Sequence, residues 1–120
     1  MNTPSRHELE AKSCTNLPPG SAALTPQQVT ALASVVPEWH VLNNKAIERE
    51  YSCATYMDGV RWFALAAAIA EQEDHHPDAL VTWRKVKLTL WTHTVDGLSE
   101  NDFILAAKLE RAWQEFTPAA

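Results

Sequence analysis

Hydrophobic residues recur along this chain with two different spacings, which separate helical segments from strands. After residue 24, four of them follow one another at intervals typical of one face of a helix: Val29, Leu32, Ala33 and Val36. Thr25 stands at the N-cap position and Pro26 at the first helical position, while Pro37 ends the pattern. We therefore expect a helix that begins at residue 26 and ends before Pro37.

A spacing of two residues predicts two pairs of strands. In residues 46–52, Ile47 and Tyr51 alternate with polar and charged residues, and residues 39–42 precede them across Asn43-Asn44-Lys45. Asparagine tolerates positive φ angles, so a tight hairpin is predicted here. A second pair is predicted at residues 80–83 and 86–93. Its alternation places two sets of residues on opposite faces: Val86, Leu88, Leu90 and Thr92 on one, and Lys87, Thr89, Trp91 and His93 on the other.

The remaining periodic segments are predicted helices. Residues 56–75 are rich in alanine, leucine and glutamate and carry apolar residues nearly all round, which is typical of a long, well-buried helix. Pro77 disfavours α geometry at the residue before it, so this helix is expected to stop at His75 or His76. A last helix begins after Ser99, with apolar positions that include Phe103, Ala106, Leu109 and Trp113.

The predicted order of elements is α-β-β-α-β-β-α. Two hairpins and three helices of these lengths indicate an α+β fold, in which a four-stranded antiparallel sheet has the three helices packed on one face. Residues 1–23 are polar, contain proline and glycine, and lack periodicity. We expect them to form an irregular N-terminal arm with a short helical piece around His7 to Ser13. Residues 24–120 are expected to form one domain.

The composition excludes several classes of protein. A net charge of −5 over 120 residues does not provide the basic surface that direct binding of nucleic acid needs. The longest apolar run, Trp62 to Ala70, is too short to cross a membrane, and no secretion signal opens the sequence. Cys14 and Cys53 form no CxxC pair, so two free thiols are favoured over a structural disulfide. We therefore expect a cytoplasmic protein that binds neither nucleic acid nor membrane.

Histidines and acids gather in the second half of the chain. The candidate site residues are Glu71, Asp74, His75, His76, His93 and Asp102. Glu71, Asp74 and His75 fall on one stripe of the predicted long helix, at the end where the dipole favours a protonated imidazole. His76 is expected to point elsewhere because Pro77 turns the chain. Imidazole can both give and take a proton near neutral pH, so this set predicts acid/base catalysis in a shared cleft.

Each candidate residue also has a purely structural interpretation. Asp102 lies three residues after Ser99, the position of the acid in a capping box, and the two roles are compatible. Glu71 and Asp74 could be solvated helix charges, and His76 before a proline is an adequate helix stop. Histidines and acids could also bind zinc. The spacing is not that of a helical zinc pair, however, so no metal site is expected.

The spacing Glu71-x3-His75-His76-Pro77-x5-Trp83-x9-His93-x8-Asp102 resembles the signature of the pterin-4a-carbinolamine dehydratases, in particular the bacterial type. The agreement continues through residues 97–99 and 101–106 and covers about residues 24–113. Members of this family share the order of elements predicted above. Two positions depart from the family pattern. Ala79 replaces a tryptophan of the animal members, and Cys14 alone remains of a Cys-x-x-Cys stretch that many bacterial members carry.

The resemblance implies a lyase that dehydrates 4a-hydroxytetrahydropterin to quinonoid dihydropterin. This reaction recycles tetrahydrobiopterin, the cofactor of aromatic amino-acid hydroxylases. The resemblance implies no metal and no bound cofactor, because the pterin is the substrate. By position, His75 and His93 match the acid/base catalysts, and His76 matches the third histidine of the catalytic site, which helps to hold the pterin. Glu71, Asp74 and Asp102 match the acids of the substrate-binding pocket.

The resemblance also implies partners. Homodimers or homotetramers are expected, and an aromatic amino-acid hydroxylase is the expected functional partner. Two non-catalytic roles of the same fold stay open as alternatives, namely a dimerisation cofactor of a transcription factor and an assembly factor for a carbon-fixing enzyme. The complete set of site residues favours the enzyme, because a protein kept only for its surfaces has no need of that set.

Overall fold

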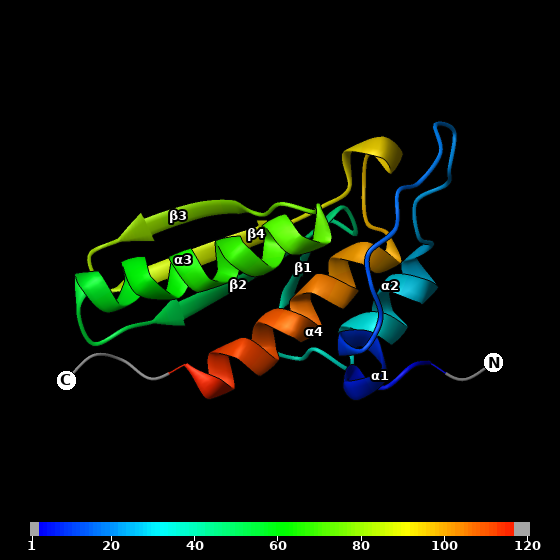
Figure 1. Ribbon diagram of the computed structural model, residues 1–120. Helices are drawn as coiled ribbons and strands as arrows, with labels where there is room; N and C mark the ends of the chain where they lie inside the picture. The colour runs from blue at the N-terminus through cyan, green and yellow to red at the C-terminus, as the bar shows by residue number, and fades with distance from the viewer. Residues whose placement is uncertain (1–2, 117–120) are drawn as a thin grey trace.

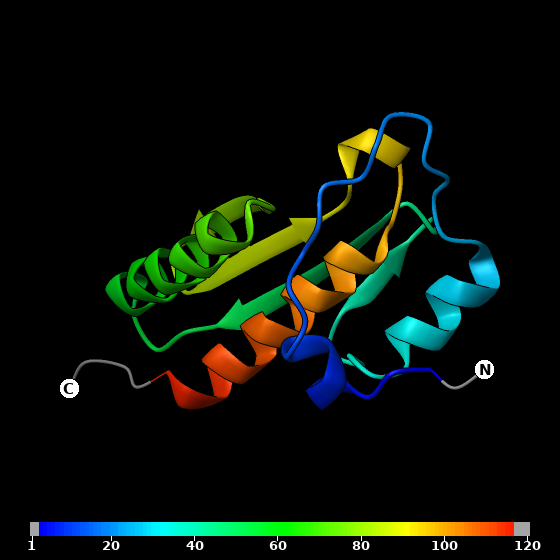
Figure 2. The same ribbon diagram turned by 45° about the vertical axis from the view of Figure 1, so that its right-hand side comes forward.

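The computed structural model describes residues 3–116 and contains a four-stranded antiparallel sheet. Its strands, in the order β1-β2-β4-β3, are β1 (His40–Leu42), β2 (Ala46–Ser52), β3 (Asp78–Thr82) and β4 (Lys85–Leu90). The main helices are α2 (Pro26–Ala33), α3 (Tyr56–Glu73) and α4 (Glu100–Glu115). Helices α3 and α4 lie side by side against one face of the sheet (Figures 1 and 2). The predicted fold class and order of elements are therefore confirmed. In the part of the chain that is described, no helix has both the length and the hydrophobicity to cross a membrane.

The alternating pattern of β2 and β4 places their apolar residues in the core. Five side chains of these two strands have no exposed surface: Ile47, Tyr51, Val86, Leu88 and Leu90. The register pairs Ile47 with Leu90 and Tyr51 with Val86, so the inward-facing residues of the two strands lie beside each other. Asn43 and Asn44 have φ angles of 51° and 57°. Two successive positive φ angles are typical of the tight turn predicted for the β1–β2 hairpin.

Strand β4 ends at Leu90, so the prediction that His93 ends a strand is wrong. Leu90 pairs with Ile47, the second residue of β2, and the pairing with β3 already ends at Thr89, so a strand continued to residue 93 would run past both neighbours. Thr92 instead pairs with Gly97 in an isolated bridge. This bridge closes a loop in which His93 begins the short 3-10 helix η1 (His93–Val95).

Helix α3 also stops earlier than predicted, at Glu73. Asp74 adopts a left-handed conformation with a φ angle of 51°, and the N–H groups of Asp74 and His75 both bond back to the carbonyl of Ala70. This cap satisfies carbonyl groups of the last turn before Pro77 restricts the chain. His75 therefore lies outside the helix, and the prediction that it shares a helical stripe with two acids is wrong.

The N-terminal arm packs onto the rest of the molecule. It contains the short helix α1 (Arg6–Glu10), whose N-terminus carries a capping box and which lies against α4 (Figure 2). Leu9 has no exposed surface and belongs to the core. Lys108 Nζ of α4 donates a hydrogen bond to the carbonyl of Glu10 at 2.9 Å. The arm therefore contributes apolar contacts to the fold, and α4 is covered on its outer side.

A buried carboxylate joins α4 to β2 and to the residue just before β1. Glu110 is 2% exposed and accepts hydrogen bonds from the indole of Trp39 at 3.0 Å and from the hydroxyl of Tyr51 at 3.3 Å. Arg49 Nη1 donates to its other oxygen at 2.6 Å. Burial raises the pKa of Glu110, while the charge of Arg49 opposes that rise. Because a buried carboxylate needs such partners, this network fixes how α4 crosses the sheet.

Replacing Leu9 with alanine tests whether the arm contributes to stability. The change removes apolar contacts between α1 and α4, and buried leucine-to-alanine substitutions cost about 2–5 kcal/mol of unfolding free energy. Chemical denaturation should show a loss in this range for Leu9→Ala. Leu42→Ala, at a leucine that is 38% exposed, is the matched control and should cost well under half as much. Equal losses in the two variants would contradict the packing of the arm.

Candidate active site

A cleft of about 270 Å³ opens beside the end of α3. The N-terminal arm, the residues after α3, the loop that contains η1 and the start of α4 meet around it (Figures 1 and 2). Four of the six predicted site residues line the cleft: Asp74, His75, His76 and His93. The sequence separates the first three from the fourth by a whole hairpin, and the fold brings them together.

His75 is held from behind by a fully buried carboxylate. Its Nε2 lies 2.6 Å from Oδ1 of Asp102. The side chain of His75 is 12% exposed and that of Asp102 is not exposed at all. Asp102 therefore reaches the cleft only through the histidine ring. A carboxylate accepts hydrogen bonds and cannot donate them, so this contact orients the imidazole.

Asp102 is also the acid of the N-terminal cap of α4. Its second oxygen, Oδ2, accepts hydrogen bonds from the backbone N–H of Ser99 at 3.0 Å and from the hydroxyl of Thr92 at 2.8 Å. The Ser99 hydroxyl lies 2.7 Å from the Thr92 hydroxyl. Because Thr92 donates its own hydrogen to Asp102, its oxygen is available to accept the hydrogen of Ser99. Asp102 is thus both the capping acid of α4 and the hydrogen-bond partner of a histidine in the cleft.

His93 enters the cleft from a different element. As the first residue of η1 it is exposed, and its ring stacks on the indole of Trp91, with centroids 3.8 Å apart and planes inclined by 27°. The Trp91 indole N–H in turn points at Asp78 Oδ2, 3.4 Å away. Trp91 therefore lines the cleft and supports the ring of His93.

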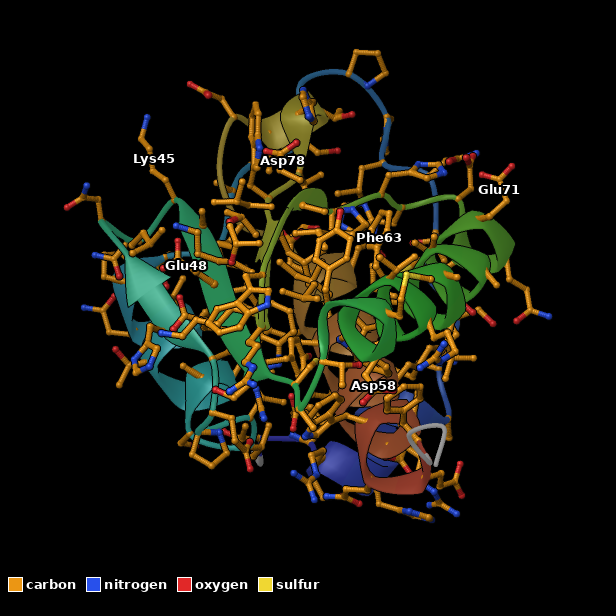
Figure 3. The ribbon with its side chains drawn as sticks, turned by 90° about the vertical axis from the view of Figure 1, so that its left-hand side faces the viewer. Lys45, Glu48, Asp58, Phe63, Glu71 and Asp78 are labelled. Atoms are coloured by element: carbon orange, nitrogen blue, oxygen red, sulfur yellow. The ribbon has the colours of Figure 1, made fainter. Side chains whose placement is uncertain are left out.

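The second of the adjacent histidines has a solvent-exposed partner. His76 Nε2 lies 2.7 Å from Glu71 Oε1, and these side chains are 54% and 80% exposed. Figure 3 shows Glu71 at the outer side of the end of α3, and this residue is not among those that line the cleft. Each of the two histidines after α3 therefore has a carboxylate partner, buried for His75 and exposed for His76. Within residues 3–116 no group of three or more histidine, cysteine or acidic side chains is arranged to hold a metal ion.

The cleft also contains residues that the sequence pattern did not single out. Thr15, Asn16 and Leu17 of the arm line it, together with Asn101 at the start of α4. Nothing in the polar, aperiodic arm indicates this position. A signal did exist for Thr92, because it was expected on the apolar face of its strand and is indeed buried. A hydroxyl at such a position needs a partner, which here is Asp102.

Comparison with known sequences gives extensive matches. The sequence model of the family described as pterin 4 alpha carbinolamine dehydratase matches residues 22–112. A protein of Alkaliphilus metalliredigens, provisionally named a pterin-4-alpha-carbinolamine dehydratase, is 36% identical over 110 residues, which cover 91% of this chain and 99% of that protein. A mitochondrial protein of Arabidopsis thaliana, pterin-4-alpha-carbinolamine dehydratase 2, is 42% identical over 91 residues. That match covers 72% of this chain and 49% of the plant protein.

The fold has a solved relative as well. A crystal structure from Brucella melitensis, described as a transcriptional coactivator/pterin dehydratase, matches with a TM-score of 0.70 and 28% sequence identity, covering 74% of this chain and 96% of the other. The family match includes every element that surrounds the cleft except the N-terminal arm. On these grounds the chain belongs to the pterin-4-alpha-carbinolamine dehydratase family.

Proposed function

We propose that this protein dehydrates 4a-hydroxytetrahydropterin to quinonoid dihydropterin and thereby recycles the cofactor of aromatic amino-acid hydroxylases. The observation that carries the proposal is the cleft itself, in which His75, held by the buried Asp102, faces the same space as His76 and His93. The reaction moves two protons. One must reach the 4a-hydroxyl so that it leaves as water, and one must be removed from a ring nitrogen. Positioned side chains that titrate near neutral pH can do both.

His75 is suited to remove the proton from the ring nitrogen. In the neutral ring the hydrogen on Nε2 is donated to Asp102, so Nδ1 keeps its lone pair. No hydrogen bond to Nδ1 is formed within residues 3–116, which leaves this atom available to substrate. When Nδ1 takes a proton, the carboxylate behind the ring stabilises the charge that forms. Asp102 acts in this proposal as a positioning residue.

His93 is suited to deliver the proton to the leaving hydroxyl. Its ring is exposed to the cleft and held in orientation by the face of Trp91, and bulk solvent can reprotonate it after each turnover. His76 and Asp74 lie in the same cleft, where they would contact the polar edge of the pterin. Glu71 would contribute through its pair with His76. All proton transfers are thus assigned to side chains of the protein.

Replacing both proposed acid/base histidines tests this function. His75→Ala and His93→Ala should each lower the catalysed dehydration by about a hundredfold or more, because positioned acid/base groups contribute that much. The double variant should be little worse than the more damaged single variant, since the two groups act in one step. Stopped-flow absorbance of 4a-hydroxytetrahydropterin decay measures the rate. His40→Ala, at an exposed histidine of β1 outside the cleft, is the control.

Turnover of the parent protein should also survive treatment with a strong chelator, since no step uses a metal. Near-normal rates in both single histidine variants would refute the acid/base assignment. A rate abolished by the chelator would point to a metal site instead.

The variant Asp102→Asn tests the positioning role separately. The backbone N–H of Ser99 can only donate, so the amide oxygen of the variant should keep that bond and turn its NH₂ group toward His75. Nε2 must then accept, and the hydrogen of the neutral ring moves to Nδ1. Nitrogen-15 NMR above the titration range of the ring should show the Nε2–H tautomer in the parent and the Nδ1–H tautomer in the variant. Dehydration should fall about a hundredfold or more.

The variant Glu71→Gln is matched to it, because it makes the same change at the partner of the neighbouring His76. It should leave the tautomer of His75 as in the parent. If Asp102→Asn keeps the Nε2–H tautomer and loses activity all the same, the carboxylate acts through something other than the hydrogen of His75.

A second candidate function is a binding role without catalysis, as a dimerisation cofactor of a transcription factor or an assembly factor for a carbon-fixing enzyme. The description of the Brucella protein as both coactivator and dehydratase favours keeping this candidate. The two functions separate in the His75→Ala variant, which removes a cleft side chain and leaves the outer surface intact. A partner bound equally well by parent and variant would act on that surface.

We also infer a cytoplasmic protein that assembles with copies of itself. Cys14 and Cys53 are both free thiols, which suits a reducing compartment. Strands β1 and β3 are the edges of the sheet. Leu80 of β3 and Trp83 in the turn after it are 53% and 70% exposed. An uncovered edge with large apolar side chains favours pairing with another chain.

Light scattering at micromolar concentration should therefore find dimers or tetramers, with no dominant species at the 13.4 kDa of one chain. The charged variant Leu80→Lys should shift the distribution toward the single chain if β3 is the pairing edge, since lysine on an edge strand opposes pairing. A parent protein that scatters as a clean monomer would remove the assembly proposal and leave the catalytic one untouched.

A further inference from the structure

The N-terminal arm is built into the cleft, although it lies outside residues 22–112, the segment that the family model matches. Thr15, Asn16 and Leu17 line the cleft and belong to no helix or strand. Figures 1 and 2 both show this part of the arm running across the start of α4 and alongside η1. One wall of the site is therefore made by residues that precede this matched segment.

The side chain of Asn101 holds this wall through hydrogen bonds to its backbone. Its side-chain Oδ1 accepts the N–H of Thr15 at 3.0 Å, and its Nδ2 donates to the carbonyl of Thr15 at 2.7 Å. The amide thus makes both hydrogen bonds that a neighbouring strand would offer to that residue. Asn101 is only 8% exposed and directly precedes Asp102, so the wall is tied to the same turn of α4 that holds His75.

Cys14 supplies a second tie. Its backbone N–H donates to Glu73 Oε1 at 2.8 Å, and its thiol donates to the carbonyl of Asn101 at 3.5 Å. Glu73 is itself held by Lys108, 3.6 Å away. Burial, followed by the charge of Glu73, raises the pKa of the Cys14 thiol to about 12, so the thiol stays protonated and acts as a donor.

The far side of the wall is anchored too. After Leu17, the carbonyl of Pro18 accepts the backbone N–H of Ser21 at 3.1 Å and its hydroxyl at 2.6 Å, which closes a tight turn. The N–H of Leu24 then donates to the carbonyl of Leu98 at 2.9 Å. Ties on both sides hold residues 15–17 in a fixed place relative to the histidines.

We infer that this wall selects the side chain of the pterin, an inference that rests on the proposed function. The reacting edge of the ring must face His75 and His93, so the substituent of the ring is left to the other walls. Within residues 3–116, the hydroxyl of Thr15 and the amide of Asn16 make no hydrogen bond, and both residues are exposed at the cleft. These groups suit a substituent that carries hydroxyl groups over one that is purely aliphatic.

Asn16→Ala in the full-length protein measures the selection. Parent and variant are compared on two 4a-hydroxytetrahydropterins, one with a dihydroxypropyl substituent at C6 and one with a methyl group there. We divide kcat/KM for the dihydroxypropyl substrate by kcat/KM for the methyl substrate. Because the variant loses one hydrogen bond to the dihydroxypropyl group, this ratio should fall about five- to tenfold. The change should appear in KM for the dihydroxypropyl substrate. Gln72→Ala, at an exposed amide of α3 outside the cleft, should keep the parental ratio.

Asn101→Ala tests the hydrogen bonds of Asn101 by releasing Thr15. Hydrogen exchange at the Thr15 amide should become faster, and the substrate ratio should fall in the same direction as in Asn16→Ala. Because Asn16 is exposed, its variant remains informative even if Asn101→Ala folds poorly. A substrate ratio that stays at the parental value in Asn16→Ala, or equal losses on both substrates, would overturn the inference.

Binding separates this inference from the proposed function. Calorimetry with 7,8-dihydrobiopterin and 6-methyl-7,8-dihydropterin gives the same comparison without turnover. If the parent protein catalyses neither reaction, the proposed function fails, and the ratio of the two dissociation constants still decides the role of the arm. If the parent binds neither ligand, both proposals fall.

Discussion

The carboxylate of Asp102 is the point on which the arrangement of the site depends. It has no exposed surface, and its two oxygens accept hydrogen bonds from three segments, whose donors lie 27, 10 and 3 positions before it in the chain. His75 follows α3, Thr92 follows β4, and Ser99 precedes α4. A buried carboxylate without such donors is costly, so the three segments must stay together for the chain to fold. The cleft is the space that this requirement leaves between them.

Helix α4 carries this constraint into the rest of the molecule. Its residues 101–107 are all buried, whereas a helix on one face of a sheet usually has an exposed side. The arm and α1 cover that side, which explains why Ile104 and Ala107 are as buried as the residues facing the sheet. Farther along, Glu110 ties the same helix to β2. The helix thus spans the distance between the cleft and the opposite end of the sheet.

Local patterns in the sequence predicted the elements well and their ends less well. The alternation in β2 and β4 and the capping residues before α2 depend on neighbours in the chain, and these predictions are confirmed. The end of β4 depends on where β2 begins in the register, which is a long-range property. The end of α3 depends on a left-handed Asp74, and no glycine marks that conformation. The contact of Thr15 with Asn101 joins residues 86 positions apart, and no periodicity indicates it.

Asp102 and His93 differ in how strongly the fold itself would preserve them during evolution. Asp102 caps a helix and fills a buried network, so a descendant chain that had lost catalysis would still be under pressure to keep it. His93 is exposed at the start of η1, and within residues 3–116 its ring stacks on Trp91 and makes no hydrogen bond or ion pair. Little in the fold would resist its replacement once the chemistry was no longer needed. Under the proposed mechanism, His93 is therefore the more informative marker of retained activity among relatives of this chain, and Asp102 is a marker of retained architecture.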